Sequence, residues 1–294
     1  MVCGLTLETS TCTCRWWSKE TVAVVTGANR GIGLALVKCL AEHGLTVVLT
    51  CRDMKKGIKA VESLRANGLD VSFCTLDVAD EASIKAFAIW LQEAFGRLDI
   101  LVNNAAVSFN AINENSVEHA ETVIRTNYYG PKLLIEALLP LFRRSQSISR
   151  ILNISSRLGS FNKVSNPTVR KLLEDEEKLS EDLIDDLVRR FLDQVSSGTW
   201  AQQGWPKLWT DYSVSKLALN VYSKLLAKRY QGRGLSVNSF CPGFTRTAMT
   251  RGQGNHTAEM AAEIGARCLL LPPDKLPTGE FFVEKIRRSV YSKL

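Results

Sequence analysis

Short apolar runs alternate with helical patterns along most of this chain. The runs have the length and composition of strands that are buried on both faces, and such alternation is typical of a parallel sheet with helices on both sides. The expected strands are 22–25, 46–50, 71–76, 100–103, 150–154, 236–240 and 280–283, and the expected helices are 34–43, 54–66, 81–95, 117–139, 212–230 and 258–271. The sequence therefore predicts an α/β fold built on a doubly wound parallel sheet.

Length and composition fit one large core. The chain has 294 residues, 45% of them hydrophobic, and contains no internal repeat or low-complexity linker. A chain of this size can bury a single large core. We expect one domain over residues 19–284, between a flexible N-terminal tail at 1–18 and a C-terminal tail at 285–294.

A glycine-rich turn follows the first expected strand. Gly27, Gly31 and Gly33 stand between that strand and a helical pattern. Glycines at such a turn let the backbone approach a pyrophosphate, whose charge is met by free N–H groups at the helix start. The spacing Gly-x-x-x-Gly-x-Gly differs from the more common Gly-x-Gly-x-x-Gly, but the strand-turn-helix context predicts a dinucleotide site.

Tyr212 and Lys216 are four residues apart in an expected helix, so their side chains share one face. A phenol has a pKa of about 10, and a cation roughly 5 Å away at an effective dielectric of about 20 lowers it by about two units. Such pairs are common on amphipathic helices, but together with a cofactor turn this one predicts acid-base chemistry on a carbonyl group.

Four further motifs occur in order along the chain. They are Asn103-Asn104-Ala105, Asn127, Asn153-Ile154-Ser155-Ser156 and Pro242-Gly243. With the glycine turn and the Tyr212–Lys216 pair, they resemble the signature of the short-chain dehydrogenase/reductase family, although Asn104-Ala105-Ala106 departs from that family's Asn-Ala-Gly. The resemblance implies a Rossmann fold and a catalytic set of Asn127, Ser156, Tyr212 and Lys216.

The family's mechanism assigns a role to each member of this set. Tyr212 would give its proton to the carbonyl oxygen while the reduced nicotinamide delivers hydride to the carbon, and Ser156 would donate a hydrogen bond to the developing oxyanion. Lys216 would hold the nicotinamide ribose and lower the pKa of Tyr212. Asn127 would position a water that links Lys216 to solvent. The alternatives are a kink in a buried helix for Asn127 and a cap at a strand end for Ser156.

The residues after the second expected strand favour NADP(H) over NAD(H). Cys51 stands where enzymes that prefer NAD usually have an acid, and the guanidiniums of Arg52 and Arg30 could bind a 2′-phosphate. Asp53 is a competing NAD signal, but we interpret it as the N-cap of the helix 54–66. The turn and the resemblance add cofactor contacts at Asn29, Ile32, Asp77, Val78, Asn103, Ala105, Pro242, Gly243, Thr245 and Thr247.

Between Ser156 and Tyr212 the chain has 55 residues, whereas the family usually has far fewer. This inserted segment, at about 160–211, carries an acidic helical stretch at 174–195 and three tryptophans. Similar insertions mark the monomeric carbonyl reductases and a plant branch that contains menthone, neomenthol and salutaridine reductases, so the resemblance implies a monomer. The tryptophans either line the substrate pocket or only attach the insertion to the body.

Other signals exclude several function classes. The net charge of +7 is spread along the chain, which argues against nucleic-acid binding, and the three histidines are isolated, so no metal site is expected. No apolar run has transmembrane length, and the cysteines are expected to be reduced thiols. Ser292-Lys293-Leu294 resembles the address read by the peroxisomal import receptor, so a peroxisomal location is expected, with cytoplasmic residence as the alternative.

These features predict an NADPH-dependent reductase that converts a ketone or aldehyde carbonyl of a small apolar, possibly cyclic, substrate to an alcohol, or catalyses the reverse oxidation. Two alternatives stay open. One is an enone double-bond reductase of the same family, which the retained Tyr212 disfavours. The other is a non-catalytic NADP-binding regulator, which the retained Tyr212 and Lys216 disfavour.

Overall fold

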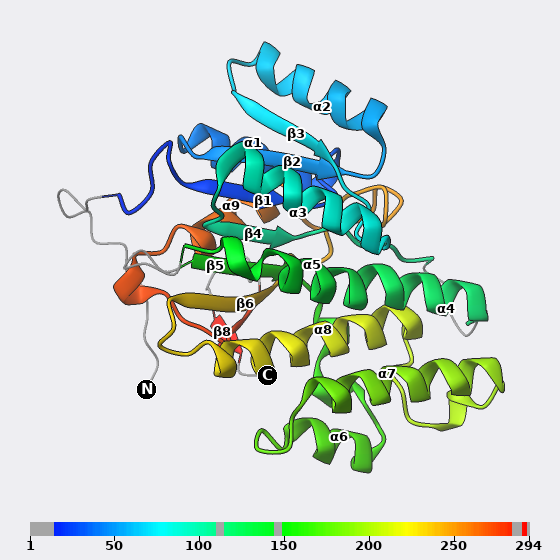
Figure 1. Ribbon diagram of the computed structural model, residues 1–294. Coiled ribbons are helices and arrows are strands. Elements are labelled where there is room, and N and C mark those ends of the chain that lie inside the picture. The colour runs from blue at the N-terminus through cyan, green and yellow to red at the C-terminus, as the bar shows by residue number, and fades with distance from the viewer. Residues whose placement is uncertain (1–14, 110–114, 144–148, 284–289, 293–294) are drawn as a thin grey trace.

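One mostly parallel sheet forms the centre of the molecule. The computed structural model describes residues 15–109, 115–143, 149–283 and 290–292, and their strands follow the order β3-β2-β1-β4-β5-β6-β7-β8 (Figure 1). The strands are β1 Val22–Val25, β2 Thr46–Cys51, β3 Val71–Thr75, β4 Ile100–Asn103, β5 Ser149–Ile154, β6 Leu235–Cys241, β7 Phe281–Val283 and β8 Val290–Ser292. Strands β1 to β7 are parallel, and β8 pairs antiparallel with β7. The predicted doubly wound sheet is confirmed.

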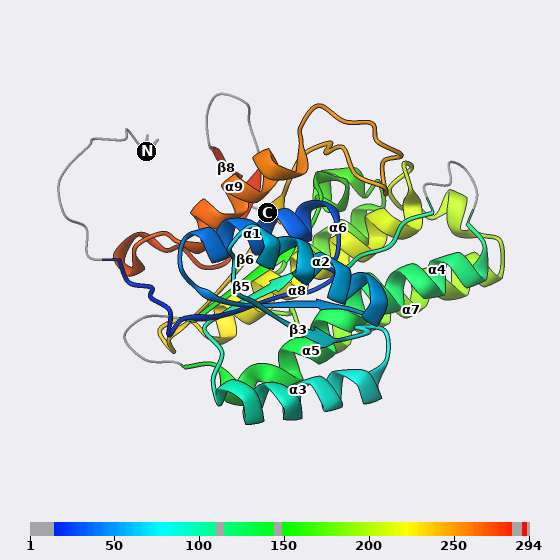
Figure 2. The same ribbon diagram turned by 90° about the horizontal axis from the view of Figure 1, so that it is seen from above.

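Helices cover both faces of this sheet (Figure 2). They are α1 Gly31–Glu42, α2 Met54–Ala66, α3 Glu81–Phe95, α4 Val117–Ile124, α5 Gly130–Leu138, α6 Pro167–Glu174, α7 Glu181–Ser196, α8 Thr210–Arg229 and α9 Ala258–Leu269. Helices α1, α2 and α9 contribute to the apolar core on one face, and α3, α4, α5 and α8 to the core on the other. Because the strands are parallel, their carboxyl ends meet at one edge, where the strand order reverses between β1 and β4.

The predicted helix at 117–139 is interrupted by a π-helical turn, η1 Arg125–Tyr129, between α4 and α5. A π-turn adds a residue to the helical repeat and often marks a functional site. Here the consecutive side chains of Asn127 and Tyr128 are both fully buried. The apolar pattern of the sequence continues through the turn and therefore gave no sign of it.

The insertion forms two helices, α6 and α7, rather than the single acidic helix predicted at 174–195. Ser180 starts α7 by accepting a hydrogen bond from the N–H of Leu183. The buried face of α7 packs on α4 and α8. Asp185 of α7 accepts hydrogen bonds from the Tyr128 hydroxyl and the Lys132 amine, both at 2.7 Å. The acidic residues of α7 thus bind the body of the protein as well as facing solvent.

The described parts of the two predicted tails contact the body of the protein. Trp16, inside the predicted tail at 1–18, donates its indole N–H to the carbonyl of Leu270 at 3.3 Å and lies 3.6 Å from the Arg150 guanidinium. At the other end, Val290–Ser292 extends the sheet as β8 instead of leaving it. No helix in the described part of the chain has the length and apolar composition needed to cross a membrane.

Candidate active site

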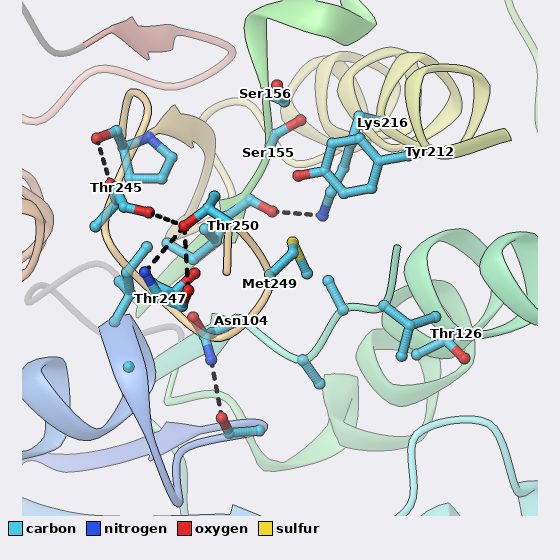
Figure 3. Close-up of a pocket in the computed structure, with 18 of the residues that line it drawn as sticks. Asn104, Thr126, Ser155, Ser156, Tyr212, Lys216, Thr245, Thr247, Met249 and Thr250 are labelled. Carbon is cyan, nitrogen blue, oxygen red and sulfur yellow. Dashed lines mark hydrogen bonds between the residues drawn. The ribbon is translucent and has the colours of Figure 1, made fainter. Parts of the chain in front are cut away.

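A cavity of about 630 Å³ opens at the carboxyl edge of the sheet. Its wall begins at the turn after β1, passes the ends of β2 and β4, and continues to the start of α8 and the loop that follows β6. Figure 3 shows the phenol of Tyr212 and the amine of Lys216 pointing into this space. Across from them lie Thr245, Thr247 and Thr250 of the loop after β6. The topology thus brings together motifs that lie far apart in the sequence.

The glycine-rich turn is fixed by its neighbours and leaves no room for side chains. Gly27 has a φ of 61°, and a Cβ there would lie 2.7 Å from the Cα of Ala105. A Cβ on Gly33 would lie 2.4 Å from the side-chain nitrogen of Asn104. That nitrogen donates hydrogen bonds to the carbonyls of Thr26 at 2.8 Å and Gly27 at 3.2 Å. These close approaches and hydrogen bonds fix the backbone conformation of the turn at the edge of the cavity.

The start of α1 suits an anionic ligand. Its N-cap, Arg30, makes no side-chain capping bond, and its first turn carries no acidic residue. Free N–H groups and the positive end of the helix dipole favour a phosphate at such a position. Together with the glycine cradle and the size of the cavity, this arrangement fits a nicotinamide dinucleotide, whose pyrophosphate would lie against the start of α1.

The turn after β1 and the end of β2 each carry an arginine that was predicted for a 2′-phosphate site. Arg30 and Arg52 both line the cavity and are exposed, and within the described residues neither pairs with a carboxylate. Asp53 is the N-cap of α2, where its side chain accepts a hydrogen bond from the N–H of Lys56 at 3.0 Å, so that interpretation is confirmed. Cys51 is buried and lines the cavity in place of an acid.

The loop after β6 closes the cavity on the opposite side. Thr245 donates its hydroxyl to the carbonyl of Pro242 at 3.0 Å, and the hydroxyl of Thr250 accepts from the N–H of Thr247 at 3.0 Å. A Cβ on Gly31 would lie 3.6 Å from the methyl carbon of Thr247. This loop therefore lies directly over the glycine-rich turn, where it could cover a bound cofactor.

Tyr212 and Lys216 lie one turn apart on α8 and converge on the cavity. The Lys216 amine lies 5.6 Å from the centre of the Tyr212 ring and donates a hydrogen bond to the carbonyl of Ile154 at 2.8 Å. That bond ties the catalytic helix to the end of β5, next to Ser156. The Ser156 hydroxyl accepts from the N–H of Leu158 at 3.1 Å, so it also caps the turn after the strand.

Burial dominates the proton affinities of both groups. It raises the pKa of the Tyr212 phenol well above its ordinary value, with a further rise from the Cys241 thiol, and a hydrogen bond from Ser156 offsets only part of this. Burial also lowers the pKa of Lys216 to about 7, although Cys241 acts in the opposite direction. The expected fall in the pKa of Tyr212 is thus wrong for this state. Desolvation disfavours the charged phenolate, and it outweighs the effect of the Lys216 amine, which lies 5.6 Å from the centre of the ring.

Both polar atoms of the Asn127 side chain form hydrogen bonds within the protein. Its amide nitrogen donates to the carbonyl of Val107 at 2.9 Å and to the Ser215 hydroxyl at 3.1 Å, and its oxygen accepts from the N–H of Val107 at 2.8 Å. Asn127 therefore holds the π-turn against the loop after β4 and against α8. The helix around Asn127 forms a π-turn, and the hydrogen bonds of Asn127 hold Val107 on the cavity wall.

Most predicted site residues line the cavity. These are Gly27, Asn29, Arg30, Gly31, Ile32, Arg52, Asp77, Val78, Ala105, Ser156, Tyr212, Lys216, Pro242, Gly243, Thr245 and Thr247. Three lie behind the wall: Gly33, Asn127 and Asn103, whose side chain donates to Asn153 at 2.8 Å. Trp209 also lines the cavity, as expected for at least one tryptophan of the insertion. Residues that the sequence did not assign to the site line it too, among them Asn104, Leu208, Phe244, Met249 and Thr250. Asn104 could have been found from its motif, but the apolar residues depend on the shape of the pocket.

Comparison with known proteins agrees with this geometry. The family model for short chain dehydrogenases matches residues 21–168 and 194–266, which leaves out 169–193, the middle of the insertion. The chain belongs to the short-chain dehydrogenase/reductase family. Members of this family are oxidoreductases that use a nicotinamide cofactor.

Relatives of this chain share nearly its full length. It is 39% identical over 287 residues to (+)-neomenthol dehydrogenase of Arabidopsis thaliana, covering 90% of this chain and 96% of that protein. It is 35% identical over 272 residues to carbonyl reductase [NADPH] 1 of Homo sapiens, covering 90% and 96%. The structure of salutaridine reductase from Papaver somniferum superposes with a TM-score of 0.84 at 36% identity, covering 90% and 100%. These similarities confirm the predicted branch of this family.

Proposed function

We propose that this protein is an NADPH-dependent reductase that converts the carbonyl of a small apolar ketone or aldehyde to an alcohol. The observation that carries the proposal is the placement of a half-buried Tyr212 beside Ser156 and Lys216, on the wall of a cavity that also holds a glycine cradle. Relatives named as a neomenthol dehydrogenase, a salutaridine reductase and a carbonyl reductase support the reaction class.

The proposed chemistry assigns one task to each side chain. When bound, NADPH supplies the hydride. Tyr212, whose phenol is protonated at neutral pH, donates its proton to the carbonyl oxygen. Ser156 donates a hydrogen bond to the same oxygen as negative charge develops there. Lys216, fixed by its bond to Ile154, holds the cofactor ribose and passes a proton to the spent phenolate, a role that a pKa of about 7 suits.

The preference for NADPH rests on charge at the end of β2. The guanidiniums of Arg30 and Arg52 line the cavity and can bind a 2′-phosphate. Cys51 stands at the position where a carboxylate would repel that phosphate. A relative named for NADPH supports this choice. We therefore expect NADPH to bind more tightly than NADH.

The proposed substrate is apolar because the far part of the cavity is apolar. The apolar side chains that line the cavity include Val107, Leu158, Leu208, Trp209, Phe244 and Met249. A pocket of this kind binds a hydrocarbon skeleton by removing its surface from water, while Tyr212 and Ser156 provide polar groups for the carbonyl oxygen.

A substrate panel tests the proposal. Purified protein is incubated with NADPH or NADH and with a set of cyclic ketones, linear aldehydes and enones, and the products are identified by gas chromatography. The expected result is alcohol formation that depends on NADPH. Saturated ketones from the enones, with the carbonyl intact, would instead identify a double-bond reductase. Consumption of no substrate by a protein that binds NADPH would favour the regulator.

Two further properties belong to this proposal. The enzyme is a monomer, because α7 covers α4 and α8, the helices through which shorter relatives would pair. It is also addressed to peroxisomes through Ser292-Lys293-Leu294, with cytoplasmic residence as the alternative. Ser292 of β8 pairs with Phe281 of β7, whereas Lys293 and Leu294 lie outside the described residues. Recognition by the import receptor would therefore require the end of β8 to separate from β7.

A further inference from the structure

Trp209 has a backbone conformation that residues with a side chain rarely adopt. Its φ of 47° and ψ of 60° lie in the left-handed region, which it shares with only Arg251 among the described non-glycine residues. The position is the N-cap of α8, three residues before Tyr212. Tryptophan supplies no side-chain capping bond there, although serine, threonine, asparagine or aspartate usually would. Strain of this kind persists where the surroundings fix it, and it is concentrated at functional sites.

Ser213 fixes the strained turn. Its N–H donates to the carbonyl of Trp209 at 2.7 Å, and its hydroxyl donates to the carbonyl of Leu208 at 2.6 Å. The indole is consequently held beside the catalytic phenol, with ring centres 6.3 Å apart and an interplanar angle of 81° to Tyr212. Trp209 is half-buried and lines the cavity. The unfavourable backbone conformation thus places a large flat apolar surface next to the proton donor.

The other tryptophans of the insertion are placed differently. Trp205 is buried away from the cavity, where its indole N–H donates to the side chain of Gln194 at 2.7 Å and its ring packs edge-on against Phe191 at 5.3 Å. Trp200 packs against the apolar core. These two attach the insertion to the body, so Trp209 is not needed for that purpose.

We propose that Trp209 is a specificity-determining residue that forms a flat apolar wall for the ring of a cyclic ketone. This inference rests on the proposed carbonyl reduction and names its substrate class. A ketone whose oxygen faces Tyr212 and Ser156 must place its carbon skeleton on the adjacent wall. A ring system there buries more apolar surface against the indole than a short linear chain does. Leu208 and Phe244, which are 45% and 43% exposed, extend the apolar surface of the same cavity.

The test compares wild type with Trp209→Ala, Trp209→Gly and Trp209→Phe, using Trp205→Phe as the matched control. The readout is the ratio of kcat/KM for 4-tert-butylcyclohexanone to kcat/KM for propanal. Loss of one large aromatic contact corresponds to roughly a 10- to 100-fold fall in this ratio for the alanine and glycine variants. Phenylalanine should retain most of the ratio. Trp205→Phe should lower the melting temperature and leave the ratio within about threefold.

Two further measurements keep the outcomes separate. Trp209→Gly should melt at a higher temperature than Trp209→Ala, because glycine adopts positive φ without strain, so a misfolded alanine variant does not end the test. Binding of 4-tert-butylcyclohexanone to the protein with NADP⁺ is measured by calorimetry. If wild type binds the ketone without reducing it, the proposed reaction is wrong. The Kd values of the variants then still test whether Trp209 contributes to binding of the ring. An unchanged ratio in an active, folded Trp209→Ala variant overturns the inference, as does a wild type that neither binds nor reduces the ring ketone.

Discussion

Replacing Lys216 by methionine should stabilise the protein at neutral pH and destabilise it at pH 10. Lys216 is 2% exposed, and no carboxylate pairs with its amine among the described residues, so burial lowers the pKa of this amine from 10.5 to about 7. The unfolded chain then binds the proton more tightly than the folded chain. Unfolding therefore takes up a proton between about pH 7 and 10.5, and stability rises with pH through that window.

The magnitude follows from the same shift. Each pKa unit corresponds to about 1.4 kcal/mol, so Lys216 destabilises the fold by about 4 kcal/mol at pH 7 and by less than about 1 kcal/mol at pH 10. Methionine removes this penalty but leaves the carbonyl of Ile154 without its hydrogen bond, which costs about 1–3 kcal/mol at either pH. The net effect is a gain of about 2 kcal/mol at pH 7 and a loss of about 1 kcal/mol at pH 10.

Chemical denaturation of both proteins at pH 7 and pH 10 measures the change, because other titrating groups cancel between variant and wild type. Lys132→Met is the matched control. Burial alone would lower the pKa of Lys132, but Asp185 and Glu181 outweigh it and raise the pKa. That lysine stays charged in both states over this range, so its removal should destabilise by a similar amount at pH 7 and pH 10. The reasoning is refuted if Lys216→Met shows the same stability change at both pH values.

Further predictions concern catalysis, the cofactor, assembly and location. Tyr212→Phe should lower kcat by about 10²- to 10⁴-fold with little change in the Kd for NADPH, measured by fluorescence titration; near-normal turnover would contradict its role as acid. Arg52→Asp should weaken NADPH binding by roughly 5- to 30-fold and NADH binding much less, and equal losses would place Arg52 away from the phosphate. Light scattering after size exclusion should give one species near 32.6 kDa, and a stable tetramer would exclude the proposed cover by α7. An N-terminal fluorescent fusion should form puncta with a peroxisomal marker and become diffuse without Leu294; a diffuse intact fusion would favour the cytoplasm.

Residues close together in sequence determined the elements and much of the cofactor site. The apolar runs set the strands because each is covered on both faces, and the glycine turn marks the start of α1 because only glycine suits its backbone at Gly27. Asp53 could be assigned as a helix cap for the same local reason. The Tyr212–Lys216 spacing placed both side chains on one helix face. Each of these inferences needs only a few neighbouring residues.

Tertiary packing decided what depends on distant surroundings. The direction of the pKa shift at Tyr212 is set by burial, which brings together α8, β5 and Cys241. The π-turn at Asn127 exists because its amide bonds to Val107 and Ser215, which belong to other segments. The indole of Trp209 lines the cavity because the fold brings the start of α8 next to the turn after β1 and the loop after β6. Local sequence carries propensity and periodicity, whereas desolvation, side-chain pairing and backbone strain depend on contacts that only the folded chain makes.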